Sequence, residues 1–297
     1  MNRMKSWALV ALLGACKPGA KGDQAGGTRG TPTKAATVAG FQTPESVLWD
    51  SAQDVYYVSN INGNPGEKDG NGYISVIDSS GAVKYTIKGL DAPKGMVLTP
   101  NWLWVTDIDM IRSFDPGNGA PGARVPIPGA VFLNDIAVGP DGALYITDTA
   151  IRFGSQGAEH VGTDRIFRVT EGYLRVSVAL QTDSLARPNG ITWDAANQRF
   201  IVVPFGGNSL LAWKPGETTV TKLATGPGQF DGVEITRDGA LWVSSWADSS
   251  VYRYANGQGT NLIKGVPSPA DIGYDARRNR LLIPIFTGNR VEIWQLQ

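Results

Sequence analysis

Side chains that carry oxygen atoms recur at one position of a repeated phrase, and these residues are the best suited to chemistry in the chain. After Phe41 the phrase occurs six times, and its second residues are Glu45, Lys94, Asn134, Asn189, Asp231 and Ala270. All of these except Lys94 and Ala270 carry side-chain oxygens. Carboxylate and amide oxygens are donors that hard divalent cations prefer, and a carboxylate can also accept a proton from water. Because these residues are far apart in the chain, they can form one site only if the fold brings the six copies together.

Each copy of the phrase predicts two short strands joined by a turn. The first strands are PESVLWD, PKGMVLT, LNDIAVG, PNGITWD, FDGVEIT and PADIGYD, and the second are DVYYVSN, LWVTD, LYITD, FIVVPF, LWVSSW and LLIPIF. Each unit of about 40 to 50 residues has room for two further strands, which would give a four-stranded sheet. One small sheet can bury both of its faces only by stacking against neighbouring sheets around an axis. The sequence therefore predicts an all-β fold, a six-bladed β-propeller of four-stranded antiparallel blades.

The last unit ends at Gln297 directly after its third strand, so its fourth strand has to come from elsewhere. The apolar segment 36–41, ahead of the first unit, is the candidate for this strand. We expect a propeller over residues 36–297 that is closed by an N-terminal strand and contains almost no helix. Each second residue should lie just before an innermost strand, so its side chain should point toward one mouth of the central channel.

The starts of four units resemble those of the senescence marker protein, gluconolactonase and regucalcin-like family. The matching motifs are E-S-V-L-W from Glu45, N-D before GPDG from Asn134, N-G-I-T-W from Asn189, and D-G before LWVSSW from Asp231. They occur in units one, three, four and five, in the order and spacing of that family. The resemblance implies that Glu45, Asn189 and Asp231 bind one divalent ion and that Asn134 contacts the substrate.

This resemblance also implies an activity, the metal-dependent hydrolysis of a lactone or related ester at the mouth of the channel. The implied site has two carboxylates and an amide oxygen, which suit Ca²⁺, with Zn²⁺ or Mg²⁺ as alternatives. Such an ion polarises a carbonyl group as a Lewis acid and lowers the pKa of a water molecule, and Asp231 is the candidate catalytic base. The expected partner is therefore a small-molecule lactone or ester.

Two residues depart from the family and keep a second hypothesis open. Many of its lactonases carry an arginine two residues before the N-D asparagine, where this chain has Phe132, so a polar sugar-acid lactone is disfavoured. Lys94 would place a positive charge near the channel mouth and oppose a cation, unless it points away or pairs with a carboxylate. The alternative is a non-catalytic NHL-like propeller that serves as a ligand- or protein-binding module.

Two loops offer further candidates. His160, the only histidine, lies in a loop of unit three that is long enough to lean over the channel, either as a base or as an ordinary surface residue. Segment 60–72 is rich in Gly, Asn and Asp, but it lacks the spacing of an EF-hand. A long connection within unit one, which could also rim the site, explains it better.

The balance of charge excludes one class of partner. Lys plus Arg and Asp plus Glu number 27 each, and the formal net charge is +0. No excess of positive charge is present to hold phosphates, so we expect no nucleic-acid partner. With a single cysteine no intramolecular disulfide can form, and packing alone has to hold what we expect to be a monomer.

The N-terminus has the pattern of a bacterial lipoprotein signal. Arg3 and Lys5 precede a short apolar run that ends in L-G-A-C at Cys16, which resembles a lipobox. We expect residues 1–15 to be a signal peptide, Cys16 to carry the lipid, and residues 16–35 to be a flexible tether. The protein would then be an exported lipoprotein, periplasmic or on the cell surface, that contacts membrane only through this anchor. The alternative is a simple signal peptide with an incidental thiol.

Replacing Cys16 by serine tests the anchor. Acyl chains on Cys16 would be the protein's only stable attachment to a membrane, so the Cys16→Ser variant should move from the membrane fraction to the soluble fraction. Fractionation of cells that express either form measures this. A variant that still sediments with the membranes would contradict the prediction.

Overall fold

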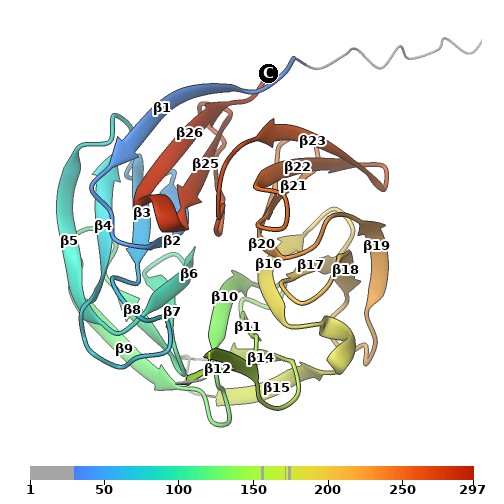
Figure 1. The fold of residues 1–297 in the computed structure, drawn as a ribbon. Coiled ribbons are helices and arrows are strands. Elements are labelled where there is room, and N and C mark those ends of the chain that lie inside the picture. The colour runs from blue at the N-terminus through green and yellow to red at the C-terminus, as the bar shows by residue number, and fades with distance from the viewer. Residues whose placement is uncertain (1–29, 155–156, 171, 173–174) are drawn as a thin grey trace, which may run out of the picture. The chain divides into compact units, whose positions relative to one another are not determined.

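The computed structural model describes residues 30–154, 157–170, 172 and 175–297. The chain divides into two units, Met1–Gly30 and Thr31–Gln297, and the second of them is compact. The second unit is a ring of six four-stranded sheets (Figure 1), so the predicted six-bladed propeller is confirmed. The predicted signal peptide, the lipidation site Cys16 and residues 16–29 of the predicted tether lie outside the described residues.

In blades one to three the strands follow one another from the channel outward, and neighbouring strands pair antiparallel. Blade one consists of β2 (Pro44–Asp50), β3 (Val55–Asn60), β4 (Gly72–Asp78) and β5 (Val83–Leu90). Blade two consists of β6 (Pro93–Leu98), β7 (Leu103–Asp107), β8 (Met110–Phe114) and β9 (Pro121–Pro126). Blade three consists of β10 (Leu133–Val138), β11 (Leu144–Asp148), β14 (Arg165–Thr170) and β15 (Arg175–Gln181). Between β11 and β14 the chain forms a separate hairpin of β12 (Ile151–Gly154) and β13 (Gly157–His160).

Blades four and five repeat this order, and blade six completes the ring. Blade four consists of β16 (Pro188–Asp194), β17 (Arg199–Pro204), β18 (Ser209–Trp213) and β19 (Thr221–Thr225). Blade five consists of β20 (Phe230–Ile235), β21 (Leu241–Ser245), β22 (Ser250–Ala255) and β23 (Gln258–Lys264). Blade six consists of β24 (Gly273–Asp275), β25 (Arg280–Ile285), β26 (Arg290–Gln295) and β1 (Thr33–Ala39).

Helix is confined to two short 3₁₀ turns within the described residues, as predicted. They are η1 (Asp183–Leu185) and η2 (Phe286–Gly288). Neither these nor any other described segment forms a helix with the length and apolar character needed to cross a membrane.

The apolar core lies between neighbouring blades. Every residue of β3, β7 and β11 is buried, because adjacent blades cover both faces of each second strand. Trp104 of blade two, for example, belongs to one cluster with Leu133, Ile146 and Phe167 of blade three. The outer strands β9 and β15 are largely exposed. Burial of the apolar faces therefore requires the whole ring.

Strand β1 closes the ring by pairing antiparallel with β26. Thr33 lies opposite Gln295, and the ammonium of Lys34 forms an ion pair with Glu292 at 2.8 Å. The prediction that an N-terminal strand completes blade six is confirmed. The strand begins at Thr33, so residues 33–35, which the sequence analysis assigned to the tether, belong to the blade.

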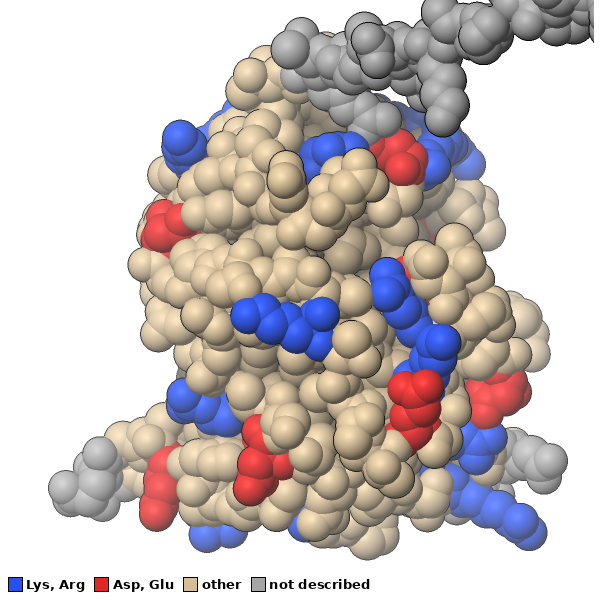
Figure 2. Space-filling view, turned by 90° about the vertical axis from the view of Figure 1, so that its right-hand side faces the viewer, with Lys and Arg blue, Asp and Glu red and all other residues tan. Residues whose placement is uncertain are grey.

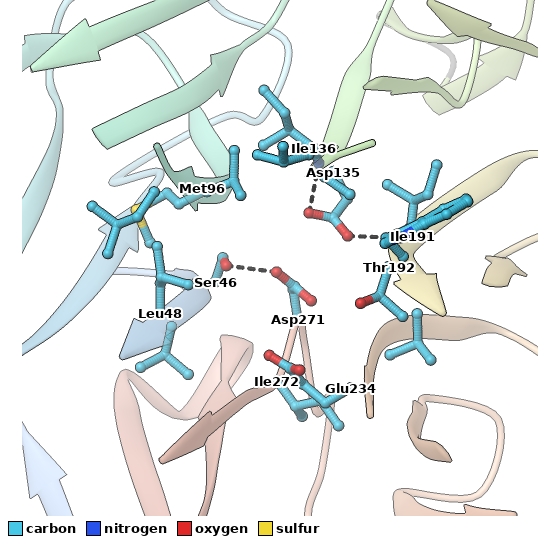
Figure 3. Close-up of a pocket in the computed structure, with 17 residues that line it drawn as sticks. Ser46, Leu48, Met96, Asp135, Ile136, Ile191, Thr192, Glu234, Asp271 and Ile272 are labelled. Carbon is cyan, nitrogen blue, oxygen red and sulfur yellow. Dashed lines mark hydrogen bonds between the residues drawn. The ribbon is translucent and has the colours of Figure 1, made fainter. Parts of the chain in front are cut away.

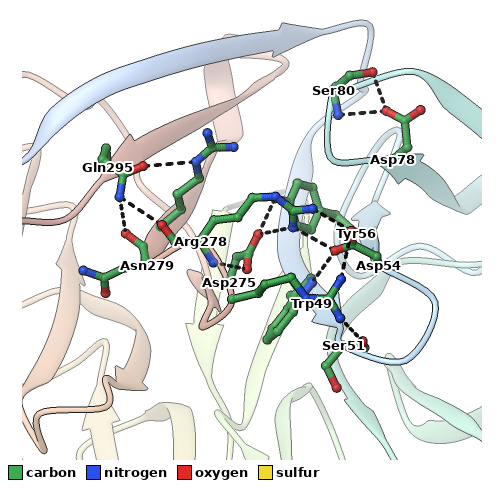
Figure 4. Close-up of polar contacts among 12 residues, drawn as sticks. Trp49, Ser51, Asp54, Tyr56, Asp78, Ser80, Asp275, Arg278, Asn279 and Gln295 are labelled. Carbon is green, nitrogen blue, oxygen red and sulfur yellow. Dashed lines mark hydrogen bonds and ion pairs between the residues drawn. The ribbon is translucent and has the colours of Figure 1, made fainter.

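A cluster of polar side chains also joins blade six to blade one (Figure 4). The guanidinium of Arg278 contacts Asp54 of blade one at 2.5 and 2.8 Å and Asp275 of blade six at 2.8 Å. Tyr56 of blade one donates to the same Asp275 carboxylate at 2.8 Å. The hydrogen bonds from Arg278 hold the pKa of Asp54 well below its usual value. The junction at which the ring closes is thus fixed by side chains as well as by strand pairing.

Removing the closing strand should destabilise the propeller. Deleting residues 36–41 takes away most of β1 and the buried ring of Phe41, and losing one such ring alone typically costs about 3 kcal/mol. Deleting residues 21–30 should change the free energy of unfolding little. Thermal denaturation followed by circular dichroism measures both deletions. Equal losses of stability would mean that the closing strand is misassigned.

Candidate functional site

Five of the six repeated positions line one pocket, and these are Glu45, Lys94, Asn134, Asn189 and Asp231. Each is the second residue of the innermost strand of its blade. These residues therefore lie inside the strands, whereas the sequence had predicted that they lie just before them. The sixth position, Ala270, is buried and has no side-chain oxygen to offer. The structure thus brings together all four predicted site residues from blades one, three, four and five.

A repeated irregularity of the inner strands frees these side chains from the sheet. In blades one to five, the pairing of the first strand with the second breaks after its first residue and resumes three residues later, for example between Pro188 and Ile191. An irregularity of this kind bends the strand and re-aims a side chain. The second residue of each strand is therefore released from the ladder and can line the pocket.

Glycine follows two of the site residues, Asn189 and Asp231, and allows the next inner strand to approach closely. A Cβ atom on Gly190 would lie 2.4 Å from the carbonyl oxygen of Asp231, and one on Gly232 would lie 2.4 Å from the backbone nitrogen of Ile272. Only glycine permits this contact between neighbouring backbones. The N-G and D-G motifs therefore have a packing role, because they let Asn189 and Asp231 share one pocket.

Three oxygen atoms of the pocket have no hydrogen-bond partner among the described residues. They are Glu45 Oε2, Asn189 Oδ1 and Asp231 Oδ1, on residues that are 5%, 5% and 4% exposed. An unpaired buried polar group costs about 1–3 kcal/mol, so three such atoms in one pocket are a set whose cost a bound ligand would offset. A divalent cation fits them, because all three are hard oxygen donors. They belong to the residues that the family resemblance assigns to the metal.

The donor set is unusual in containing only two carboxylates. Within the described part of the chain, no three side chains of His, Cys, Asp or Glu are grouped so as to hold a metal ion. The candidate set is completed by the amide oxygen of Asn189. Asn134 differs from the three, because its Nδ2 donates to Thr149 Oγ1 at 3.4 Å.

Burial disfavours the charged form of both carboxylates. The pKa of Glu45 is raised well above its usual value by burial and then by the charges of Asp231 and Asp271. The pKa of Asp231 is raised by burial and then by Asp271. A positive ion bound between the two carboxylates would lower both pKa values, so ion binding should displace protons.

Lys94 lies inside the pocket and does not point away from it. Its ammonium is 4.0 Å from the centroid of the Phe132 ring and donates to the carbonyl oxygen of Ala92 at 3.1 Å. No ion pair joins it to a carboxylate of the described residues. Burial lowers the pKa of Lys94 to about 8, although the charge of Glu45 acts in the opposite direction. The lysine therefore loses its proton at a lower pH than an exposed lysine does.

A second group of carboxylates lies further along the inner strands (Figure 3). Ser46 donates to Asp271 Oδ2 at 2.5 Å, and Asp135 accepts from the backbone N–H of Ile191 at 2.7 Å. Burial raises the pKa of Asp271 to about 7 and that of Glu234 to about 8. Asp271 raises the pKa of both Glu45 and Asp231, so its carboxylate, when ionised, adds negative potential to the pocket.

Sequence reasoning missed most of the apolar wall of the pocket. The wall consists of Ile61, Pro65, Phe132, Ile151, Phe153, Phe205, Trp246 and Phe286. A signal for it was present, because Phe205, Trp246 and Phe286 are the last residues of the phrases FIVVPF, LWVSSW and LLIPIF. An aromatic residue repeated at one position of three blades indicates a shared location, just as the repeated oxygens did.

Both long loops of the sequence analysis reach the pocket. The hairpin of blade three contributes Ile151 and Phe153, and the connection between β3 and β4 contributes Ile61 and Pro65. His160 is not among the described lining residues, and its Nε2 lies 2.7 Å from Asp164 Oδ1. The hairpin therefore acts on the site through apolar side chains.

The fold and the pocket together define a class, the six-bladed β-propellers with an oxygen-lined pocket at the mouth of the channel. The model of the SMP-30/Gluconolactonase/LRE-like region family matches residues 43–272, and the chain belongs to this family. The resemblance inferred from the four motifs is thereby confirmed.

Solved structures share the fold over nearly the whole chain. A gluconolactonase from Xanthomonas campestris is similar at 20% identity and a TM-score of 0.69, covering 90% of this chain and 95% of that one. A luciferin-regenerating enzyme is similar at 16% identity and a TM-score of 0.68, with the same coverage of 90% and 95%. A streptogramin B lyase is similar at 12% identity and a TM-score of 0.62, covering 88% and 97%. No curated protein sequence matches the chain.

The charge of Lys94 should weaken cation binding at neutral pH. Lys94→Met keeps the length and the apolar contacts but removes the ammonium, so affinity for Ca²⁺ at pH 7 should rise on the order of tenfold. Because the pKa of Lys94 is about 8, the wild type loses this charge as the pH rises, and the two proteins should converge by pH 9. Calorimetric titration at both pH values measures the difference. Equal affinities at pH 7 would show that the ammonium does not oppose the ion.

Proposed function

We propose that this protein is a divalent-metal-dependent hydrolase that opens a lactone or a related ester in the pocket at the mouth of its channel. The observation that carries the proposal is the set of three unpaired buried oxygens on Glu45, Asn189 and Asp231. Membership of the SMP-30/gluconolactonase family supports it, as does the fold shared with a gluconolactonase.

Glu45, Asn189 and Asp231 would hold one divalent ion. Their oxygens include two carboxylates and no thiolate or imidazole, a donor set that suits hard cations. We favour Ca²⁺ over Mg²⁺ and Zn²⁺ because Ca²⁺ accepts irregular oxygen geometry and high coordination numbers, which leave room for water and substrate. When bound, the ion supplies Lewis-acid polarisation of the ester carbonyl and lowers the pKa of a water molecule.

The protein's own side chains would handle the proton and the substrate. Asp231 would act as the base, because its carboxylate belongs to the proposed ion centre and can accept a proton from a water molecule there. Asn134 would orient the substrate, because its one long hydrogen bond to Thr149 is easily exchanged for a substrate oxygen. The ammonium of Lys94 would stabilise the negative charge that develops on the substrate during ring opening.

A non-catalytic propeller, a ligand- or protein-binding module of the NHL-like kind, is the second candidate. Two observations favour it. Phe132 replaces the arginine that many lactonases of the family carry, and the ammonium of Lys94 occupies part of a pocket proposed for a cation. In that case an ion would serve structure alone.

We also propose the cellular setting inferred from the N-terminal sequence. The chain would be an exported bacterial lipoprotein, held at the membrane through acylated Cys16 and acting as a monomer in the periplasm or on the cell surface. The pocket would then meet substrates outside the cytoplasm.

Conservative substitutions test the proposed roles. Asp231→Asn keeps the shape but removes one charge and the base, so Ca²⁺ affinity should fall about tenfold and hydrolysis by a further factor on the order of 100. Glu45→Gln should weaken ion binding and turnover together, whereas Asn134→Ala should spare the ion and raise KM. Calorimetry with Ca²⁺ and initial rates on a lactone panel measure these effects.

Asp78→Asn is the matched control for these variants. Asp78 lies in a turn of blade one, where it accepts hydrogen bonds from Ser80, and it does not line the pocket. This variant should bind Ca²⁺ like the wild type. Absence of ion binding by the wild type, or binding indifferent to Asp231→Asn, would refute the metal site. A bound ion with no turnover on any lactone would favour the binding module.

A further inference from the structure

Two groups of aromatic side chains contribute to the apolar wall of the pocket. Trp246, after β21, packs against Phe205 at 5.7 Å and against Phe286 at 5.3 Å between ring centroids. In blade three the ring of Phe132, just before β10, packs against Phe153 of the β12–β13 hairpin at 5.2 Å between ring centroids. Aromatic pairs at these distances stabilise one another, so the wall is preorganised.

This wall offers few hydrogen-bond partners to a polar ligand. Thr149 carries the one hydroxyl group among the described lining residues, and it already donates to the carbonyl oxygen of Pro188 at 2.9 Å. The wall also carries the indole N–H of Trp246, which has no hydrogen-bond partner among the described residues. The remaining polar lining groups are the site residues, gathered where the inner strands begin. The pocket therefore has a polar floor for one functional group and an apolar wall for whatever is attached to it.

Phe132 places an apolar ring beside the one ammonium group among the described lining residues. Its ring lies beneath the ammonium of Lys94 at 4.0 Å, so the nearest charged donor is held against an aromatic face. The space in the pocket is about 130 Å³. An apolar cavity of roughly 150 Å³ holds a benzene-sized molecule, so one small ring with a short substituent fits here.

We propose that the pocket selects small lactones or esters with an apolar alkyl or aryl substituent, and that it discriminates against polyhydroxylated lactones. This inference rests on the proposed function and names its substrate class. Each methylene that enters the wall should improve binding about fourfold. Each hydroxyl group that is buried there without a partner should weaken binding on the order of tenfold.

A homologous series measures the preference as a slope. With the Ca²⁺-loaded full chain, kcat/KM should rise about fourfold per added carbon from γ-butyrolactone to γ-valerolactone to γ-caprolactone. Glucono-δ-lactone should be turned over more slowly than δ-valerolactone, which has the same ring without hydroxyl groups. A flat slope, or a preference for the hydroxylated ring, would overturn the inference and leave the proposed hydrolase intact.

Substitutions in the wall locate the effect. Phe286→Ser and Phe205→Ser remove apolar surface from the wall and should flatten the slope, while leaving Ca²⁺ affinity unchanged. Val83→Ser is the matched control, because Val83 is 64% exposed on β5 and does not line the pocket. It should keep the wild-type slope. A slope that survives both phenylalanine variants in folded protein would place the apolar contact elsewhere and overturn the inference.

A binding titration separates this inference from the proposed function. Ligand-observed NMR with the same lactones, in the presence of EDTA, reports affinity without ion or turnover. If no lactone is hydrolysed but affinity still rises with each carbon, the hydrolase proposal fails and the apolar preference stands. If affinity does not rise with chain length, the inference fails whatever the turnover.

Discussion

The contact between inner strands around the channel axis is the constraint on which the rest of this structure depends. At Gly190 and Gly232 the next backbone lies where a Cβ atom would be, and at Gly95 a Cβ atom would lie 2.6 Å from Asp135 Cα. Strands this close leave little volume at the axis, so the side chains one residue earlier are crowded together and shielded from water. Burial then raises the pKa of Glu45 and Asp231, so an ion that binds between them has to displace their protons. The chemistry proposed for the pocket thus follows from backbone packing.

The pocket separates two kinds of surface by their place on the strands. Polar groups stand at the start of the first strand of a blade, and the aromatic groups Phe205, Trp246 and Phe286 follow the end of the second. Because these two strands are antiparallel neighbours, the start of one and the end of the other lie at the same mouth. A single repeated unit therefore supplies both the floor and the wall, and each blade can vary one without disturbing the other.

Much of this arrangement could be predicted from the sequence, because equivalent residues of a repeated phrase occupy equivalent places in each blade. Once the phrases from Pro44 to Pro269 were aligned, Glu45, Asn189 and Asp231 had to meet if a ring formed, and the closing strand followed from the missing fourth strand of blade six. The aromatic wall was visible in the same alignment but lay outside the polar residue types that were searched. The place of Lys94 could not be predicted, because it depends on side-chain torsions and on the ring of Phe132, which lies on another blade. The repeat determines the backbone position of a residue, and local packing determines the conformation of its side chain.

The pairing of β1 with β26 also has a consequence for biosynthesis. Thr33 of β1 and Gln295 of β26 lie opposite each other, so β1 can pair only after β26 has been synthesised. Contacts between such distant positions form late, because closing a long loop has an entropic cost. Until then the chain is an open stack of blades, with an unpaired strand edge and an uncovered apolar face on each side of the gap. A product that stops before β26 never closes its ring, so the seam that stabilises the finished protein leaves every shortened copy open to proteases.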